Sequence, residues 1–389
     1  MARELGDGGW CWFGDPRAIH FAGRHRRTYA GWVSRDGEIL VASFDHRTRH
    51  LERHTLRRGL SVDDHNSPGM LMGADGRLTV FYMGPARKSM CYREMTAAED
   101  VTSWGPEVKL PTNTSGDLGY TYPNPIHLKA EQRTYLFWRG GQWWPAFSRR
   151  EDGGSWSRAR TILRQPDQRP YVKFHSDGLH SIHMAFTEGK PGSFVNSIYY
   201  LRYHDDAFHR ADGSRVARVG DLPLAPSRGD RVYDARKNGV RAWVWDIAAR
   251  RDGRPVIVYA LFPDASDDCT YMFAEFTSGA WESHRIVDAG GRIGGNYAPG
   301  ISLDHDNPNV VYLSRRVGGR YVVQRWRTSD SGATWHHRTV DTGSRGGDCL
   351  RPITPRNHNS ERDVLWMQGD YRGYTDYRTD VFAHLSRTR

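Results

Sequence analysis

Ionisable side chains gather at residues 61–68, where Asp63 and Asp64 precede His65 and Asn66. An imidazole has an unperturbed pKa near neutrality, so His65 is suited to proton transfer in catalysis. The aspartates have an alternative role, since Asp63 or Asp64 could bond backbone amides at the corner of a loop. The cluster therefore predicts either an acid–base site or a hydrogen-bonded loop corner.

The segment after this cluster has the pattern of a β-hairpin. Apolar residues 70–72 and 78–82 flank an Asp-Gly turn at residues 74–77, which is typical of two tightly joined strands. The ionisable cluster thus lies at the start of an inner strand. Polar side chains are unfavourable in a core unless they line a solvent-filled cavity.

The same unit recurs along the chain. Seven units, each with an inner strand, a tight turn and a second strand, begin near residues 17, 65, 122, 171, 245, 297 and 351. Their second strands are expected at residues 28–33, 78–82, 134–139, 181–186, 255–261, 310–314 and 364–367. Residues 329–335 form an Asp-box-like turn of the kind found between outer propeller strands, and residues 151–156 are a degenerate copy. The pattern predicts an all-β, seven-bladed β-propeller that forms a single domain over residues 1–389, with residues 380–385 sharing a blade with the N-terminus.

Composition agrees with this fold and indicates the charge of a partner. The 389 residues include 41 Gly and 19 Pro, which favour turns, and 14 Trp and 19 Tyr, which favour strands and pack between blades. The formal net charge of +10 favours an anionic partner. Nucleic acid is not expected, because the sequence has no Lys/Arg-rich run, zinc-finger spacing or helix-turn-helix pattern. An acidic carbohydrate fits the charge equally well.

The cysteine and hydropathy patterns indicate the cellular compartment of the protein. Cys11, Cys91, Cys269 and Cys349 are far apart and form no CxxC pair, which suits a reducing compartment and leaves two disulfides as an alternative. No apolar run approaches membrane-span length, so no membrane association is expected. The protein is expected in the cytoplasm if Met1 is the native start, and outside the cell if a leader was removed.

No motif in the sequence requires a cofactor. A structural calcium or zinc ion is an open alternative at two places. The candidate ligands are Asp304, His305 and Asp306 ahead of a predicted strand, and the closely spaced His175, His180 and His183.

The first residues of a propeller's inner strands meet at one mouth of the central channel, which is the default ligand site. Here these residues are basic and aromatic, which suits a sugar ring that carries a carboxylate, because aromatic faces stack on sugar rings and arginine matches carboxylates. The predicted ligand-site residues are Arg17, His65, Asn66, Tyr122, Tyr171, Lys173, Trp245, Tyr297 and Arg351.

Several motifs resemble the BNR-repeat propeller family that includes ulvan lyases and rhamnose–glucuronate lyases. They are WCWFGDPRA at 10–18, DDHNSP at 63–68, YP at 122–123 with Arg139, VKFHSDG at 172–178 with IHMAFT at 182–187, and LDHD at 303–306 with VYLSR at 311–315. The resemblance covers nearly the whole chain. It implies cleavage of a uronate-containing glycan by β-elimination.

The resemblance also implies catalytic residues. His65 matches the family's first histidine, Tyr122 its tyrosine and Arg139 its arginine. The second histidine of the family falls at the end of the strand at residues 80–84, where this sequence has Pro85. This departure from the family pattern predicts either an incomplete lyase site or a different substrate.

The chemistry of β-elimination asks for the same residue types. Removal of the C5 proton of a uronate needs a neutralised carboxylate, a base near the α-carbon and an acid at the leaving oxygen. Arg139, His65 and Tyr122 can fill these roles, with those of His65 and Tyr122 interchangeable. Two alternatives are a propeller glycoside hydrolase of the rhamnosidase or sialidase type and a non-catalytic carbohydrate-binding propeller. Hydrolysis usually needs two convergent carboxylates, whereas adjacent Asp63 and Asp64 would point to opposite faces of a strand.

Overall fold

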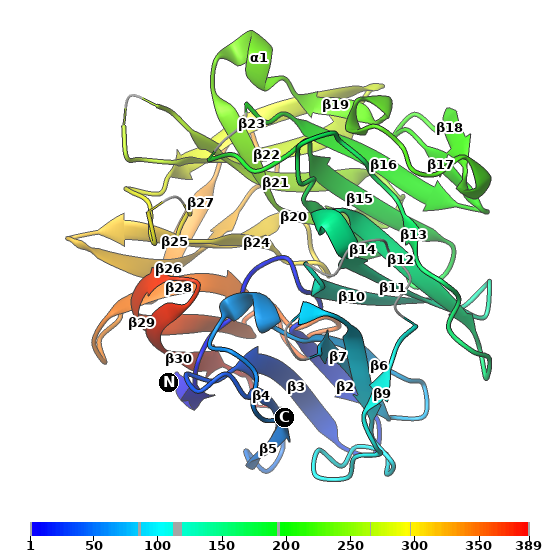
Figure 1. The fold of residues 1–389 in the computed structure, drawn as a ribbon. Coiled ribbons are helices and arrows are strands. Elements are labelled where there is room, and N and C mark those ends of the chain that lie inside the picture. The colour runs from blue at the N-terminus through cyan, green and yellow to red at the C-terminus, as the bar shows by residue number, and fades with distance from the viewer. Residues whose placement is uncertain are drawn as a thin grey trace.

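Seven antiparallel sheets follow one another around a ring in the computed structural model of the protein (Figure 1). The structure describes residues 2–84, 87–111, 119–192, 195–264, 266–295 and 297–387. Six sheets have four strands and one has six. Each sheet is one blade, so the prediction of an all-β, seven-bladed propeller is confirmed.

The first four blades are built from strands in chain order. Blade 1 contains β2 (Ala18–Ala22), β3 (Arg26–Val33), β4 (Ile39–Asp45) and β5 (Leu51–Arg57). Blade 2 contains β6 (Gly69–Met72), β7 (Leu78–Met83), β8 (Met90–Glu94) and β9 (Val108–Lys109). Blade 3 contains β10 (Thr121–Leu128), β11 (Arg133–Arg139), β12 (Pro145–Glu151) and β13 (Arg160–Thr161). Blade 4 contains β14 (Val172–Ser176), β15 (Ser181–Thr187), β16 (Ile198–His204), β17 (Ala207–His209), β18 (Arg215–Arg218) and β19 (Asp230–Tyr233).

The remaining blades complete the ring, and the last one joins both ends of the chain. Blade 5 contains β20 (Arg241–Ala249), β21 (Pro255–Phe262), β22 (Thr270–Thr277) and β23 (Ala280–Asp288). Blade 6 contains β24 (Ile301–Leu303), β25 (Val310–Val317), β26 (Arg320–Arg327) and β27 (His336–Asp341). Blade 7 contains β28 (Asp348–Ile353), β29 (Val364–Gly373), β30 (Asp376–His384) and the N-terminal β1 (Arg3–Asp7). The pairing of β1 with β30 confirms the predicted closure, which leaves no open edge between first and last blades.

The predicted second strands coincide with β3, β7, β11, β15, β21, β25 and β29 to within a few residues. Local sequence defines them well because their turns require glycine. Gly76 and Gly253 adopt φ values of 77° and 84° in the Asp-Gly turns before β7 and β21, a region that other residues enter only with strain. The Asp-box-like turn also lies where predicted, between β26 and β27, with Trp335 packed on Phe273.

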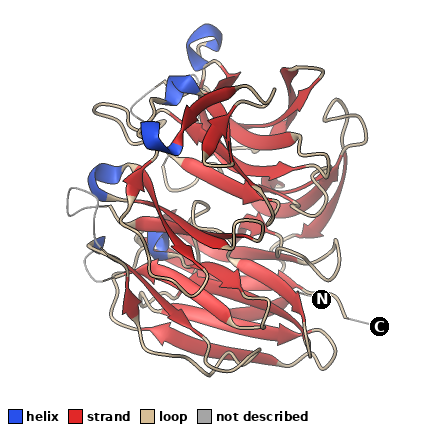
Figure 2. Cartoon of the chain, turned by 90° about the vertical axis from the view of Figure 1, so that its right-hand side faces the viewer, coloured by secondary structure: helices blue, strands red, loops and turns tan. Residues whose placement is uncertain are grey.

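The long interval between the fourth and fifth predicted units has a structural cause. Blade 4 carries the additional strands β17, β18 and β19, and three of the short helices in the described residues lie between β18 and β20. The helices are η1 (Asp64–Asn66), η3 (Gly141–Trp143), η4 (Val219–Asp221), η5 (Pro226–Arg228) and α1 (Ala235–Asn238). Figure 2 shows the short helices along one side of the ring.

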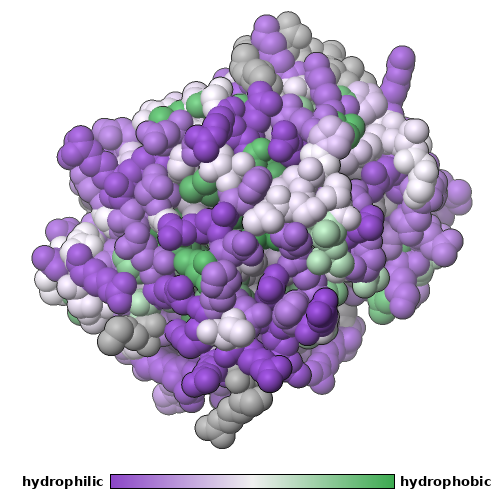
Figure 3. All heavy atoms as spheres, turned by 90° about the horizontal axis from the view of Figure 1, so that it is seen from below, coloured by the Kyte–Doolittle hydropathy of each residue, from purple (hydrophilic) through white to green (hydrophobic). Residues whose placement is uncertain are grey.

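The surface of the molecule is mainly polar. On the face in Figure 3, hydrophilic residues predominate and apolar residues form only small, separate spots. The described residues contain no helix with the length and apolar character needed to cross a membrane. All four cysteines are buried and free, so the alternative of two disulfides does not apply.

Between β1 and β2 the chain passes through the middle of the ring (Figure 1). We call residues 10–15 the plug. Trp12 of the plug stacks on Trp245 with ring centroids 4.2 Å apart. Hydrogen bonds join the plug to five blades through Asp64, Asn124, Lys173, Val244 and Arg351. The plug therefore fills the channel and forms the floor of any site at its mouth.

Candidate active site

A narrow cavity of about 10 Å³, which is room for about one water molecule, lies against the plug. Its wall comes from the plug and from the start of the inner strand region of blades 2 to 7, as expected for a propeller mouth. The lining residues are Cys11, Trp12, Phe13, Asp64, His65, Tyr122, Tyr171, Trp243, Tyr297 and Arg351. The structure thus brings together five of the predicted ligand-site residues: His65, Tyr122, Tyr171, Tyr297 and Arg351.

The imidazole of His65 is held by two carboxylates. His65 Nδ1 lies 2.7 Å from Asp63 Oδ1 and 3.0 Å from Asp64 Oδ1. A carboxylate only accepts hydrogen bonds, so Nδ1 carries the proton and Nε2 keeps a free lone pair. Burial lowers the pKa of His65 below its usual value, although the carboxylates oppose this shift. The side chain is therefore a neutral base at neutral pH.

The local backbone explains how both carboxylates reach one ring. Residues Asp64–Asn66 form the 3₁₀-helix η1, and Asp63 caps it by accepting a hydrogen bond from the backbone N–H of His65. The prediction that Asp63 and Asp64 point to opposite faces of a strand is wrong, because β6 begins only at Gly69. In a helical turn, successive side chains do not alternate as they do in a strand.

Arg87 completes the support of His65 from the neighbouring β7–β8 loop. Its guanidinium forms an ion pair with Asp63 Oδ2, while Asp63 Oδ1 receives His65. Asp63 is fully buried, so this cation offsets a charge that water does not reach. The family's second histidine position, Pro85, lies outside the described residues.

Tyr122 lies next to His65 in a strained backbone conformation. Its φ is 63°, at an irregularity in the pairing of β10 with β11. Such irregularities re-aim side chains, and non-glycine residues at positive φ are found preferentially at functional sites. The rings of Tyr122 and His65 lie 5.5 Å apart at 30°. Burial raises the pKa of Tyr122 well above its usual value, so the phenol keeps its proton at neutral pH.

Arg139, at the end of β11, lies over the Tyr122 ring at 4.3 Å and beside Trp143 at 4.6 Å. Its side chain donates to the hydroxyl of Thr121 at 3.0 Å and to that of Tyr171 at 3.2 Å. Among the described residues no carboxylate pairs with Arg139, which is only 6% exposed. The guanidinium is behind the Tyr122 and Tyr171 rings rather than in the cavity lining. A buried cation with uncharged partners is suited to an anionic ligand.

Arg351, across the cavity, differs from Arg139 because its charge is neutralised. It donates to Asp64 Oδ2 at 2.5 Å and to the hydroxyl of Tyr371 at 2.7 Å. The neighbouring Arg351 lowers the pKa of Asp64 to about 2 against the opposing effect of burial. Arg351 has a φ of 47°, so its backbone is strained in the same way as that of Tyr122.

Lys173 and Arg17 lie on the other side of the plug from the cavity. Lys173 is fully buried, donates to the carbonyl oxygen of Trp12 at 2.5 Å and pairs with Asp15. Arg17 lies 3.1 Å from the same Asp15 carboxylate. Neither cation lines this cavity, because each pairs with Asp15 of the plug, and Arg17 instead lines a separate pocket with Asp246 and His305.

Trp245 and Asn66 also lie outside the cavity. Trp245 is the extra residue of a β-bulge in β20 and stacks on Trp12, whereas Trp243 lines the cavity in its place. The side chain of Asn66 donates to the carbonyl of Ser61 and faces a neighbouring cavity shared with Arg87. Aromatic character at residues 243–245 was visible in the sequence, but the bulge was not.

Other contributors carried no clear sequence signal. Trp143 ends the short helix η3 and Arg87 lies between β7 and β8. Tyr374 contacts His65 edge-on with ring centroids 4.7 Å apart. Tyr371 binds both Asp64 and Arg351 from β29. The sequence prediction considered only the first residues of the inner strands. It therefore missed these residues, which lie elsewhere in the blades.

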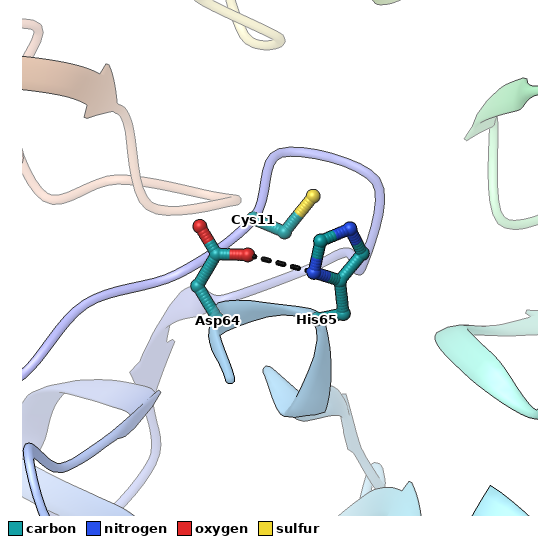
Figure 4. Close-up of side chains that lie close together, drawn as sticks. All are labelled: Cys11, Asp64 and His65. Atoms are coloured by element: carbon teal, nitrogen blue, oxygen red, sulfur yellow. Dashed lines mark ion pairs between the residues drawn. The ribbon is translucent and has the colours of Figure 1, made fainter. Parts of the chain in front are cut away.

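Three side chains at the site have metal-binding groups (Figure 4). Single donor atoms of Cys11, Asp64 and His65 lie within 4.8 Å of one another, and Figure 4 shows the three side chains converging from the plug and η1. Burial raises the pKa of Cys11 to about 11, so the thiol is protonated. The guanidinium of Arg351 on Asp64 opposes a second positive charge here. The arrangement therefore suits an anion better than a metal ion.

The histidine group that the sequence offered as a zinc site does not converge. His175 bonds His305 with Nδ1 atoms 2.8 Å apart, and His183 bonds the hydroxyl of Tyr200. His180 lies in the turn before β15, with its ring 6.3 Å from His204. Neutral histidine pairs explain these contacts without a metal.

The fold is a seven-bladed propeller, with a buried histidine and tyrosine lining a cavity at the channel and a buried arginine behind the tyrosine ring. Comparison with solved structures agrees with the fold. The structure described as polysaccharide lyase Uly1 has 13% identity and a TM-score of 0.56, over 98% of this chain and 92% of that one. A hypothetical selenium-binding protein from Sulfolobus tokodaii has 11% identity and a TM-score of 0.57, over 92% and 85%. At these identities the likeness concerns the fold alone.

The sequence itself places the protein in a family. The chain belongs to the BNR repeat-containing family, whose sequence model matches residues 27–289. No curated protein matches the chain in a sequence search.

Proposed function

We propose that the protein is a polysaccharide or oligosaccharide lyase that cleaves a uronate-containing glycan, of the ulvan or rhamnose–glucuronate type, by β-elimination. The observation that carries this proposal is Arg139, a buried guanidinium without a carboxylate partner among the described residues, placed against Tyr122 and close to neutral His65. The carboxylate of a uronate would supply the missing negative charge. The resemblance to a family with ulvan lyases supports the same conclusion.

The reaction assigns one step to each residue. His65 Nε2 removes the C5 proton, and the electron pair of that C–H bond forms the C4–C5 double bond. The C4–O bond breaks, and the leaving oxygen takes the proton of Tyr122. Arg139 stabilises the enolate-like charge that develops on the uronate carboxylate. Solvent then returns a proton from His65 to Tyr122, so the cycle needs no oxidant or reductant.

Glycoside hydrolysis is the weaker alternative because both nearby carboxylates are engaged. A hydrolase needs one protonated carboxyl group as general acid. Asp64 is held ionised by Arg351, with its pKa lowered to about 2, and Asp63 is paired with Arg87 and His65. Asp64 therefore has no proton to donate at neutral pH, and Asp63 is occupied by its contacts with Arg87 and His65.

The test is an assay of the purified full chain against a panel of acidic glycans and their neutral counterparts. Elimination creates an unsaturated uronate that absorbs near 235 nm, which hydrolysis and binding do not. Reducing sugar released without that absorbance would establish a hydrolase, and binding without cleavage would establish a carbohydrate-binding propeller; either result overturns the proposal.

A further inference from the structure

A second group of ionisable side chains lies away from the candidate active site, between blades 6 and 7. Asp304 and Asp306 belong to the turn between β24 and β25, and His358 belongs to the loop between β28 and β29. Single donor atoms of the three residues lie within 4.8 Å of one another. His358 Nε2 is 2.9 Å from Asp304 Oδ1 and 3.4 Å from Asp306 Oδ2.

Only one of the two oxygens of the Asp304 carboxylate has hydrogen-bond partners among the described residues. Its Oδ1 accepts the backbone N–H groups of Asp306 and Asn307 and contacts His358. Its Oδ2 is buried with no hydrogen-bond partner in the described part of the chain, and the residue is 0% exposed. An unpartnered oxygen on a buried carboxylate is unfavourable. A cation beside Asp304 would relieve this.

The surroundings add further negative charge. Asp363 is 0% exposed, and its Oδ2 is likewise buried without a partner in the described residues. Its charge acts on His358 together with those of Asp304 and Asp306. Here two carboxylates contact one histidine and no guanidinium pairs with either of them among the described residues, whereas at the Cys11 cluster Arg351 neutralises Asp64.

The spacing of the donor atoms matches a metal coordination shell. Ligand atoms about 2.0–2.2 Å from a zinc ion at tetrahedral or octahedral angles lie about 3–3.5 Å from one another. The distances of 2.9 and 3.4 Å at His358 are close to this range. One imidazole with two carboxylates is a donor set suited to zinc or manganese rather than to calcium or magnesium. The side chain of Asp306 is 34% exposed, which provides access from solvent.

We propose that Asp304, Asp306 and His358 form a divalent metal site of the zinc or manganese type that links blade 6 to blade 7. The site joins residues more than fifty positions apart, so a bound ion would stabilise the contact between these two blades. This inference is independent of the proposed lyase activity.

The experiment measures thermal unfolding of the chelator-treated full chain after separate addition of Zn²⁺, Mn²⁺, Ca²⁺ and Mg²⁺. Zn²⁺ or Mn²⁺ should raise the Tm by at least about 2 °C. Asp304→Asn should abolish this rise, because the amide keeps the acceptor for the turn but loses the charge. Asp306→Asn, at a partly exposed position, should weaken binding at least tenfold by calorimetry, an effect of about 1.4 kcal/mol.

Asp330→Asn is the matched control. Asp330 also accepts a backbone N–H in a turn of blade 6, but it lies outside the cluster. This variant should respond to the metal as the unmodified protein does. A rise in Tm that survives in both Asp304→Asn and Asp306→Asn, a rise with Ca²⁺ or Mg²⁺ alone, or no rise with any of the four ions would overturn the proposal.

Discussion

Arg139 and Lys173 are buried cations on neighbouring blades, one at the mouth of the channel and one beneath the plug. Lys173 pairs with Asp15, bonds the carbonyl of Trp12 and lies 3.9 Å from Asp246. The partners of Arg139 are the uncharged hydroxyl groups of Thr121 and Tyr171 and the faces of aromatic rings. Both side chains are buried, but only the charge of Lys173 is neutralised by a carboxylate among the described residues.

This difference separates a structural cation from one available to a ligand. A buried ion pair is self-contained, and removing one partner leaves the other charge exposed to a low dielectric. An unpaired guanidinium keeps its electrostatic attraction for an anion that arrives from solvent. We therefore assign Lys173 to the stability of the plug and Arg139 to the substrate.

The largest expected effect is on stability, and it is measured by replacing each of the two cations with methionine. Lys173→Met should lower the free energy of unfolding by about 3 kcal/mol, at the low end of the range for breaking a buried ion pair, because the Asp15 carboxylate keeps Arg17 but loses its second cation. Arg139→Met strands no carboxylate and should lower it by about 1–2 kcal/mol, the range of the lost ring and hydroxyl contacts. Urea unfolding of both variants measures this. Equal losses would show that pairing does not distinguish the two sites.

The next effect concerns turnover. Tyr122→Phe should reduce kcat about 10²–10⁴-fold, since it removes only the proton donor and keeps the ring that contacts His65. His65→Ala should have an effect of similar size, and the double variant should lose little more than the worse single one, because both act in one step. Arg139→Met should also weaken substrate binding. Undiminished turnover by Tyr122→Phe would remove the tyrosine from the mechanism.

The pH profile sharpens the assignment of His65 as a base. Only the neutral imidazole accepts a proton, and burial lowers its pKa below 6.5. The ratio kcat/KM should therefore reach a plateau at high pH and fall as the pH drops through a pKa that lies below the usual value for histidine. Initial rates from pH 4.5 to 9 provide the measurement. An acid limb centred above pH 6.5 would argue against neutral His65.

The smallest effect is that of salt. A protein with a formal net charge of +10 attracts a polyanion, and salt screens that attraction over about 8–10 Å at moderate ionic strength. KM for a uronate glycan should rise a few-fold on addition of salt, whereas KM for its neutral counterpart should stay constant. A neutral oligosaccharide bound as tightly as the uronate one would contradict an anionic substrate.

Part of the candidate site was predictable from the sequence. Tyr122, Tyr171, Tyr297 and Arg351 were expected at the mouth because inner strands begin there, and the cavity contains all four. His65 was expected because of the usual pKa of histidine. The ion pair of Arg87 with Asp63, which supports His65, was not expected because it joins two separate loops. His305, a candidate ligand of a structural cation in the sequence, instead bonds Asp246, and His358, far along the chain, lies beside Asp304.

The sequence by itself determined the blades. The turn before β7 needs Gly76 at positive φ, and apolar residues follow at Leu78–Met83, so local propensity and hairpin geometry specify the strands. Tertiary structure alone decided which charges are neutralised. Lys173 meets Asp15 from a distant segment, and Arg139 meets none, because ion pairing depends on contacts that strand periodicity does not encode. The strained backbone of Tyr122 belongs to the same category, since no feature of a tyrosine in sequence signals a positive φ.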